Sequence, residues 1–365
     1  MNTTKKNWLL STVVFLFFSI SCSAVQVLLP TRQITEPPSS SESGQSAPPT
    51  LAAISSTPET AELSASQSSV LNIGIMIHLE GWRDDKEREA YVKHTTLVRR
   101  YADLFEKYGA KMTFETIDVA KGDLKFGGGF LSEMRQRGHG VGLHADVGGD
   151  LKYKCERFTP TLLEMKQVFD QLGISIIHTS GVTSKCDWVK ASSQAGFKMV
   201  TGNVAFSLLS LSPDLIPEAY KNCQTPTQCH EPWPEELEKQ IHPWRAQSGS
   251  NWIIPNPDGQ VVILPESGGL PHLAEQLEDP HAKYTSDTFT KEDIDAYFIL
   301  LDQALSLADP GRVNNFYVSW SIGQSLDEAL LENWLSRLQT YVQSGRVRWM
   351  TLPEMYEEFI SWEKK

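Results

Sequence analysis

Short apolar runs alternate with amphipathic stretches from Leu71 to the end of the chain, and this alternation limits the folds open to it. Eight runs have the length of strands: LNIGIMIHL, AKMTFETID, HGVGLHA, ISIIHTSG, FKMVTG, QVVILPES, NNFYVSW and VRWMTL. Helical patterns lie between them at residues 85–108, 128–137, 160–172, 184–195, 291–308 and 325–344. Strands separated by helices pair in parallel through crossover connections. The pattern predicts an α/β fold that forms an incomplete (β/α) barrel, with a doubly wound open sheet as the alternative.

The first 24 residues have the organisation of a secretory signal peptide. Lys5 and Lys6 precede an apolar run, residues 8–18, which is shorter than the roughly 20 residues that cross a bilayer. Cleavage after Ala24 is one expected outcome. The other is lipidation of Cys22, because the leader resembles those of bacterial lipoproteins in ending at a cysteine, although Ser19 replaces their usual leucine.

Residues 25–70 contain no aromatic residue and one basic residue, Arg32. A segment so rich in Ser, Thr and Pro cannot bury enough apolar surface to offset the entropy of ordering, so it predicts a disordered linker. We therefore expect one folded domain at residues 71–365, held outside the cell or at the cell surface. Contact with a membrane is expected only through the lipid alternative at Cys22.

The cysteines and the charge narrow the setting further. An even set, Cys155, Cys186, Cys223 and Cys229, suggests disulfides in an exported chain. We favour Cys155 with Cys186 and Cys223 with Cys229, with a metal site at Cys229 and His230 as the minor alternative. The net charge of −12 and the scarcity of basic clusters argue against nucleic acid and against an anionic polymer as partners.

Polar residues stand where two of the predicted strands end. Strand side chains alternate between faces, so His78 lies beside Glu80, and His144 lies beside Asp146. If their strands are neighbours in a barrel, these four groups meet and offer nitrogen and oxygen ligands to Zn²⁺ or a similar divalent ion. Glu115 and His178 are expected at the same mouth. Solvated strand ends, hydrogen-bonded to nearby loops, are the alternative interpretation. The residues that carry this pattern also match a known family.

The segments IMIHLEGW, KMTFETID, FLSEMRQRGHGVGLHAD and AGFKMVTGNV, in this order, resemble the polysaccharide deacetylase family of carbohydrate esterases. This resemblance implies a distorted and incomplete (β/α) barrel. The resemblance implies that a metal-bound water attacks an acetamide on an N-acetylated carbohydrate polymer. It implies metal binding by Glu80 and His144. His78 falls where some relatives have the catalytic base, and it would serve as base or as a third ligand.

Three usual family positions differ in this chain. Gly148 replaces the second metal histidine, so Asp146 would substitute as ligand or act in catalysis. The residues after the fourth strand, 180–182, read Ser-Gly-Val where relatives have an arginine and a proline. The expected histidine acid near the last strands is replaced by Ser319 and Trp320.

A long segment at about 207–259 has no counterpart in the minimal pattern. It carries Trp233, Trp244 and Trp252 among prolines and polar residues, which suits stacking against sugar rings; packing of the loop onto the barrel is the equal alternative. Glu115, Trp244 and Trp252 are thus the expected substrate contacts. The later LPESGGLPHLAEQ places Glu266 and Ser267 near the mouth, without the surroundings of a serine nucleophile.

Three functions remain open from the sequence. The first is a divergent metal-dependent hydrolase that removes acyl groups from a carbohydrate polymer, cleaving amide bonds of N-acetylated sugars. The second is a non-catalytic carbohydrate-binding surface lipoprotein on the same fold. The third is a glycoside hydrolase-like activity with Glu80 and Glu115 as its carboxylate pair.

Overall fold

The computed structural model describes residues 69–281, 288–322 and 326–365. The expected leader with Cys22, and the expected linker as far as residue 68, lie outside the described residues. Within the described part, no helix has both the length and the apolar character required to span a membrane.

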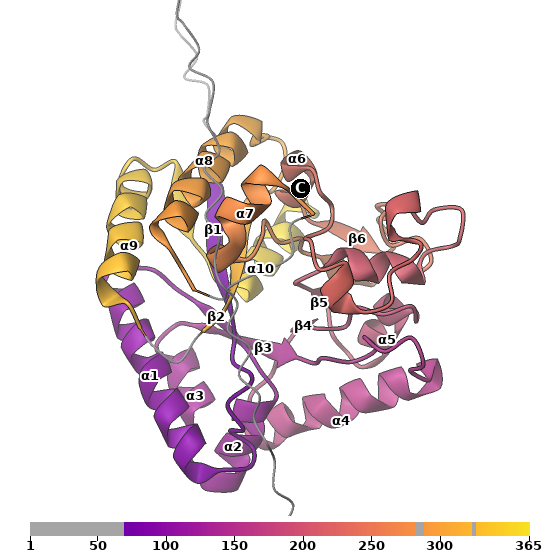
Figure 1. The fold of residues 1–365 in the computed structure, drawn as a ribbon, viewed down its shortest axis with the longest axis horizontal. Coiled ribbons are helices and arrows are strands. Elements are labelled where there is room, and N and C mark those ends of the chain that lie inside the picture. The colour runs from indigo at the N-terminus through magenta and orange to yellow at the C-terminus, as the bar shows by residue number, and fades with distance from the viewer. Residues whose placement is uncertain (1–68, 282–287, 323–325) are drawn as a thin grey trace, which may run out of the picture. The chain divides into compact units, whose positions relative to one another are not determined.

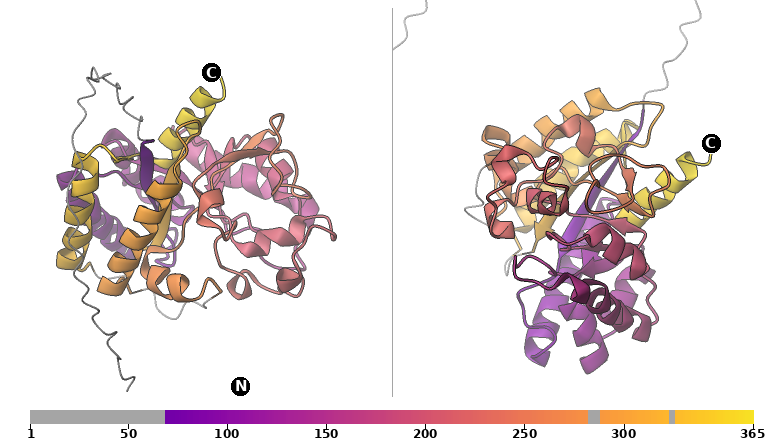
Figure 2. Two further views of the ribbon diagram at one scale, coloured as in Figure 1. Left: turned by 90° about the horizontal axis from the view of Figure 1, so that it is seen from above. Right: turned by 90° about the vertical axis from the view of Figure 1, so that its right-hand side faces the viewer.

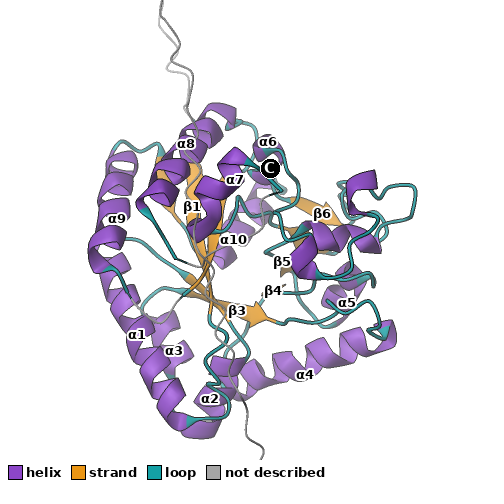
Figure 3. Ribbon diagram, viewed as in Figure 1, coloured by secondary structure: helices purple, strands orange, loops and turns teal. Residues whose placement is uncertain are grey.

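A mixed sheet forms the centre of the fold (Figures 1 and 3). Its strand order is β6-β7-β5-β4-β3-β2-β1-β8, and β9 also pairs with β1. Every pair is parallel except β6 with β7. The strands are β1 Leu71–His78, β2 Thr113–Glu115, β3 Gly140–His144, β4 His178–Ser180, β5 Met199–Val200, β6 Trp244–Ala246, β7 Val261–Ile263, β8 Asn315–Ser321 and β9 Val347–Trp349. All eight predicted strands are present, and β6 is an addition.

The sheet curls into an incomplete barrel that is closed by irregular chain. The segment that follows β7, residues 264–269, lies against β8: Ser267 N–H donates to the Tyr317 carbonyl at 2.8 Å, and Ser319 N–H donates to the Gly268 carbonyl at 2.9 Å. We call residues 264–269 the closing segment. The strand order follows the chain order around the ring, without the reversal of a doubly wound sheet, so the predicted distorted (β/α) barrel is confirmed.

Helices surround the strands in the views of Figures 1 and 2. Their bounds are α1 Arg88–Lys107, α2 Asp118–Phe126, α3 Phe130–Gln136, α4 Phe158–Gln171, α5 Trp188–Gln194, α6 Leu237–Gln240, α7 Leu273–Glu278, α8 Lys291–Leu307, α9 Glu328–Gln343 and α10 Leu352–Trp362. In α1 the buried side chains recur every three or four residues, from Tyr91 through Val98 to Phe105, so one face of the helix packs on the sheet. Each of the six predicted helical regions overlaps one of these helices, and α2, α6, α7 and α10 were not predicted.

Strand β1 is buried on both faces because it has apolar partners on each side. Ile73, Ile75 and Ile77 join the larger core, whereas Met76 joins a separate cluster with Tyr317 of the neighbouring β8 and Met199 of β5, across the barrel interior. Leu352, Met355 and Phe359 of α10 complete this second cluster. Since α10 packs beside Gly74, near the start of β1, it leaves the carboxyl ends of the strands for the functional site.

Between β5 and β7 the chain makes a long excursion of 3₁₀ turns and short elements, which includes the proposed insert at 207–259. Both predicted disulfides are present, Cys155–Cys186 and Cys223–Cys229. Because Cys229 is bonded to Cys223, the alternative metal site at Cys229 and His230 is excluded.

Candidate active site

A cleft of about 1000 Å³ opens at the carboxyl ends of the strands. His78 and Glu80 line it from the end of β1, and His144 and Asp146 line it from the end of β3. His230, Glu266, His272, Ser319, Trp320 and Ser321 contribute from later in the chain. The strand ends therefore bring the four polar residues predicted from alternation into one cavity.

His144 is the centre of this group. Its Nε2 lies 3.3 Å from Oε2 of Glu80 and 3.1 Å from Oδ1 of Asp146. Its Nδ1 is hydrogen-bonded to the Ser180 hydroxyl at 2.8 Å, so Nε2 is the nitrogen directed at the carboxylates. Partners of this kind fix the ring orientation of a metal-binding histidine.

Two carboxylates facing one imidazole create a strong preference for positive charge. Burial would lower the pKa of His144, but the hydrogen bonds that its ring donates to Asp146 and Glu80 outweigh burial and raise the pKa to about 10. The hydrogen bond from His144 lowers the pKa of Glu80 to about 2, against the opposing effect of burial. The site thus holds a proton on Nε2 when no other cation is present, and it is suited to exchange that proton for a metal ion.

The turn after β3 directs Asp146 at His144. Asp146 has a φ of 48°, a left-handed conformation that is uncommon for a residue other than glycine. Gly148 follows with a φ of 89°, and a Cβ there would lie 2.5 Å from Cε2 of Phe158. A histidine therefore has no room at 148, and the ligand that the family resemblance expects there is absent for a steric reason.

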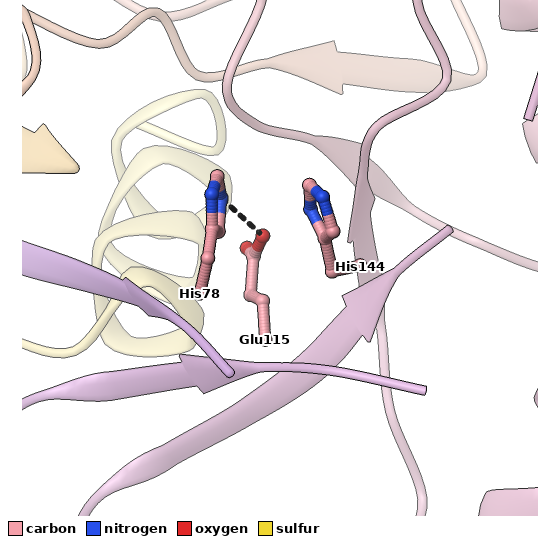
Figure 4. Close-up of side chains that lie close together, drawn as sticks. All are labelled: His78, Glu115 and His144. Atoms are coloured by element: carbon pink, nitrogen blue, oxygen red, sulfur yellow. Dashed lines mark ion pairs between the residues drawn. The ribbon is translucent and has the colours of Figure 1, made fainter. Parts of the chain in front are cut away.

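His78 stacks on His144 and has Glu115 behind it. The two ring centroids are 4.1 Å apart, with the planes tilted by 33°, and Nε2 of His78 lies 3.8 Å from Oε2 of Glu115. Figure 4 shows the Glu115 carboxylate below the two rings, with its ion pair to His78 drawn as a dashed line. Burial, assisted by His144, lowers the pKa of His78 to about 4, so this imidazole is neutral at pH 7.

Glu115 is fully buried, although the sequence analysis expected it at the mouth. Its Oε1 accepts a hydrogen bond from Thr201 at 2.8 Å and lies 3.1 Å from Nε2 of His178. Burial opposes its ionisation, but the bonds and charge from His178 and His78 prevail and lower its pKa. His178 is also fully buried, so both residues support the site from below.

Two groups of side chains have the composition and spacing for a metal ion: Glu80, His144 and Asp146, and alternatively His78, Glu115 and His144. The first fits better. Metal–ligand bonds of about 2.1 Å place neighbouring ligand atoms about 3.0–3.4 Å apart, and the two separations at His144 Nε2 agree with this. The second group includes Glu115, which is fully buried and does not line the cleft.

Strand β2 lies between β1 and β3. The two strands are therefore not neighbours, although the predicted meeting of their polar residues assumed that they were. Their side chains still meet above Glu115, at the end of β2.

The tryptophans of the insert lie elsewhere. Trp252 is fully buried and packs on Trp188, with ring centroids 5.2 Å apart. Trp244 stacks on Trp252 and donates its indole N–H to the Trp252 carbonyl at 2.7 Å. Neither lines the cleft, so the packing alternative describes them, and Trp252 offers no face to a sugar.

Glu266 was predicted near the mouth without a role, and His272 was not predicted. Both are buried and line the cleft. The only sequence signal for Glu266 was its place just after a strand.

Comparisons with known proteins bear on the fold. No family model matches the chain, and no curated protein matches it. The chain is similar in structure to a probable polysaccharide deacetylase. That protein, from Pseudomonas aeruginosa PAO1, is 9% identical, with 79% of this chain and 90% of that chain covered and a TM-score of 0.49.

Two other solved structures are similar to the same extent. Puue allantoinase is 10% identical, with 80% of this chain and 90% of that chain covered and a TM-score of 0.49. The 4-alpha-glucanotransferase of Thermococcus litoralis is 14% identical over 80% of this chain, with a TM-score of 0.47, and this chain covers 41% of it. At these identities and TM-scores the matches carry no conclusion about activity.

Proposed function

We propose that the protein is an exported, metal-dependent hydrolase that removes acyl groups from a carbohydrate polymer, cleaving the amide bonds of N-acetylated sugars. The observation that carries the proposal is the convergence of Glu80 and Asp146 on Nε2 of His144, at the floor of a cleft of about 1000 Å³. The family resemblance of the strand-end segments supports the substrate class.

In this mechanism His144, Glu80 and Asp146 would hold a divalent cation, with Zn²⁺ as the first choice for one imidazole and two carboxylates. When bound, such an ion acidifies a water molecule and stabilises negative charge on the carbonyl oxygen. Ser180 keeps Nε2 of His144 directed at the site through its bond to Nδ1. His78, neutral at pH 7, accepts the proton of the attacking water, and Glu115 stabilises the resulting imidazolium.

The steric exclusion of a ligand at Gly148 favours one competing function. A chain that has lost a metal histidine and the residues that usually follow the fourth strand suits a non-catalytic carbohydrate-binding protein on the same fold. The glycoside hydrolase alternative is weaker, because Glu115 is fully buried and does not line the cleft beside Glu80.

Titration calorimetry with Zn²⁺ and Mn²⁺ on the full chain tests the metal site. We expect one equivalent to bind, and His144→Ala to weaken binding at least 100-fold. His139→Gln is the control, because His139 lies at the opposite end of β3 and bonds to Met112 and Glu106.

Release of acetate from N-acetylated oligosaccharides tests the reaction. We expect it to require the metal and to be lost in His144→Ala. Acetate release that is insensitive to chelators would overturn the metal-dependent mechanism. One equivalent of metal with no release from any acylated carbohydrate would favour the binding protein.

A further inference from the structure

Glu266 lies in the closing segment, where backbone contacts on both sides fix its position. Tyr317 O–H donates to the Leu264 carbonyl at 2.9 Å, and Ser267 N–H donates to the Tyr317 carbonyl at 2.8 Å. The side chain is 4% exposed, yet it lines the same cleft as His144 and Asp146. The closing segment therefore presents a carboxyl group to the site from the side of the barrel opposite β2 and β3.

One oxygen of this carboxyl group has no partner in the described part of the chain. Oε2 of Glu266 is buried and makes no hydrogen bond with a described residue. It points toward Gly202, where a Cβ would lie 3.7 Å from Oε2 and 3.4 Å from Cβ of Ser180. Gly202 leaves this space open, and Ser180 is the residue that orients His144.

The charges around Glu266 oppose its ionisation. The titratable groups that face it are Glu115 on β2, His144 on β3 and Tyr317 on β8, and no described lysine or arginine pairs with it. Burial first, and then the negative charge of Glu115, raise the pKa of Glu266 to about 8, while a hydrogen bond with Ser319 acts in the other direction. A carboxyl group kept neutral in this way is able to donate a proton at pH 7.

We propose that Glu266 is the proton donor of the reaction and protonates the leaving nitrogen as the amide bond breaks. This inference rests on the proposed function and assigns to it a residue that the family resemblance did not supply. The oxygen of the attacking water bonds to the acyl carbon, and the water proton passes to His78. The C–N bond then breaks, and the nitrogen takes the proton of Glu266. His78 releases its proton to solvent, and the Glu266 carboxylate regains one from solvent. The net reaction is amide and water to carboxylic acid and amine.

The leaving group distinguishes a proton donor from a residue that only supports the fold. An amine leaves poorly unless it is protonated, whereas 4-nitrophenolate leaves without a proton. In Glu266→Gln we expect kcat for an N-acetylated oligosaccharide to fall 10²–10⁴-fold, and kcat for 4-nitrophenyl acetate to fall far less. The control is Glu275→Gln, which makes the same carboxyl-to-amide change at a partly exposed residue on α7. This variant should keep both activities.

Infrared difference spectroscopy of the full chain gives a readout that does not depend on activity. At pH 7 we expect a protonated-carboxyl stretch that is missing from Glu266→Gln and retained in Glu275→Gln. No such band, or equal losses on the amide and the aryl ester, or no loss on either, would overturn the proposal. If the wild-type chain with Zn²⁺ hydrolyses neither substrate, the proposed function fails and the proton transfer with it, while the band still reports whether Glu266 is neutral.

Discussion

Asp146 and Gly148 both have positive φ values, 48° and 89°, in the turn after β3. The turn places the Asp146 carboxylate 3.1 Å from Nε2 of His144. It also presses residue 148 against Phe158 and Ser184. A single local conformation thus places one candidate oxygen ligand and removes the space for a second imidazole.

Gly148→Ala should destabilise the protein by about 2–4 kcal/mol, because the new Cβ meets Cε2 of Phe158 at 2.5 Å and Oγ of Ser184 at 2.6 Å, in a strained backbone. Gly173→Ala is the matched control. Its φ is 69°, but a Cβ there meets no atom within 4 Å, so we expect a loss of only about 1 kcal/mol. Urea unfolding measures both, and equal losses would contradict the packing described at residue 148.

Glu266 should make stability depend on pH between about 4.5 and about 8. The folded-state pKa is raised to about 8 from 4.5, so the unfolded chain loses this proton first as the pH rises, and stability falls across that window. The fall is at most about 5 kcal/mol. Glu266→Gln should remove it, so the stability difference between variant and wild type, followed by urea unfolding, should grow with pH up to about 8. A difference that is constant with pH would refute this account.

The sequence predicted the residues whose positions depend on local geometry. Alternation along a strand placed His78 beside Glu80 and His144 beside Asp146, and the structure joins the two couples at His144. Burial of Glu266 could not be predicted, because it depends on contact between the closing segment and β8, about 50 residues later in the chain.

At the scale of elements, the longer regular pieces were predictable and the short ones were not. The three-residue β6 lies at a sheet edge and shows no alternation. The sequence of α2 contains Gly122, which weakens a helical pattern. Helix α10 could have been predicted from the sequence, because Thr351 and Glu354 have the spacing of a capping box, which marks the start of a helix. The assumption that β1 and β3 are adjacent in the sheet was wrong, because sequence patterns do not reveal which strand inserts between two others.

The two disulfides should differ in their contribution to stability. Cys155–Cys186 spans 31 positions and ties the start of α4 to the segment before α5, whereas Cys223–Cys229 spans 6. Loop-closure entropy gives about 3.5 kcal/mol for the first and about 2 kcal/mol for the second. Denaturation of the two double cysteine-to-serine variants, with the metal absent, should show the larger loss for the first pair. A larger loss for the second pair would contradict this ranking.

Trp252 should act in stability and not in carbohydrate binding. It is fully buried between Trp188 and Trp244, so Trp252→Ala should cost about 3–5 kcal/mol. Trp362→Ala, at a tryptophan that is 37% exposed, should cost clearly less. Urea unfolding compares the two. If Trp252→Ala kept its stability but lost affinity for the oligosaccharide, Trp252 would be a carbohydrate-binding residue and this prediction would be wrong.

At the scale of the molecule, the barrel has one filled end and one open end. Helix α10 packs Leu352, Met355 and Phe359 into the interior cluster at the start of the strands, and the cleft opens where the strands finish. The class of fold followed from the alternation of strands and helices. The residues that complete the ring did not follow from it, because the closing segment has no regular secondary structure to predict.

Main-chain atoms make the hydrogen bonds that join Ser267, Gly268 and Ser319 across the closing segment. Such bonds do not depend on the identity of the side chains, so the closing segment can accept substitutions at Glu266 and Ser267 while the barrel remains closed. Laboratory evolution of new reactivity on this scaffold is therefore best begun with a library at these two positions, because substitutions there can change the cleft without breaking the hydrogen bonds that close the barrel.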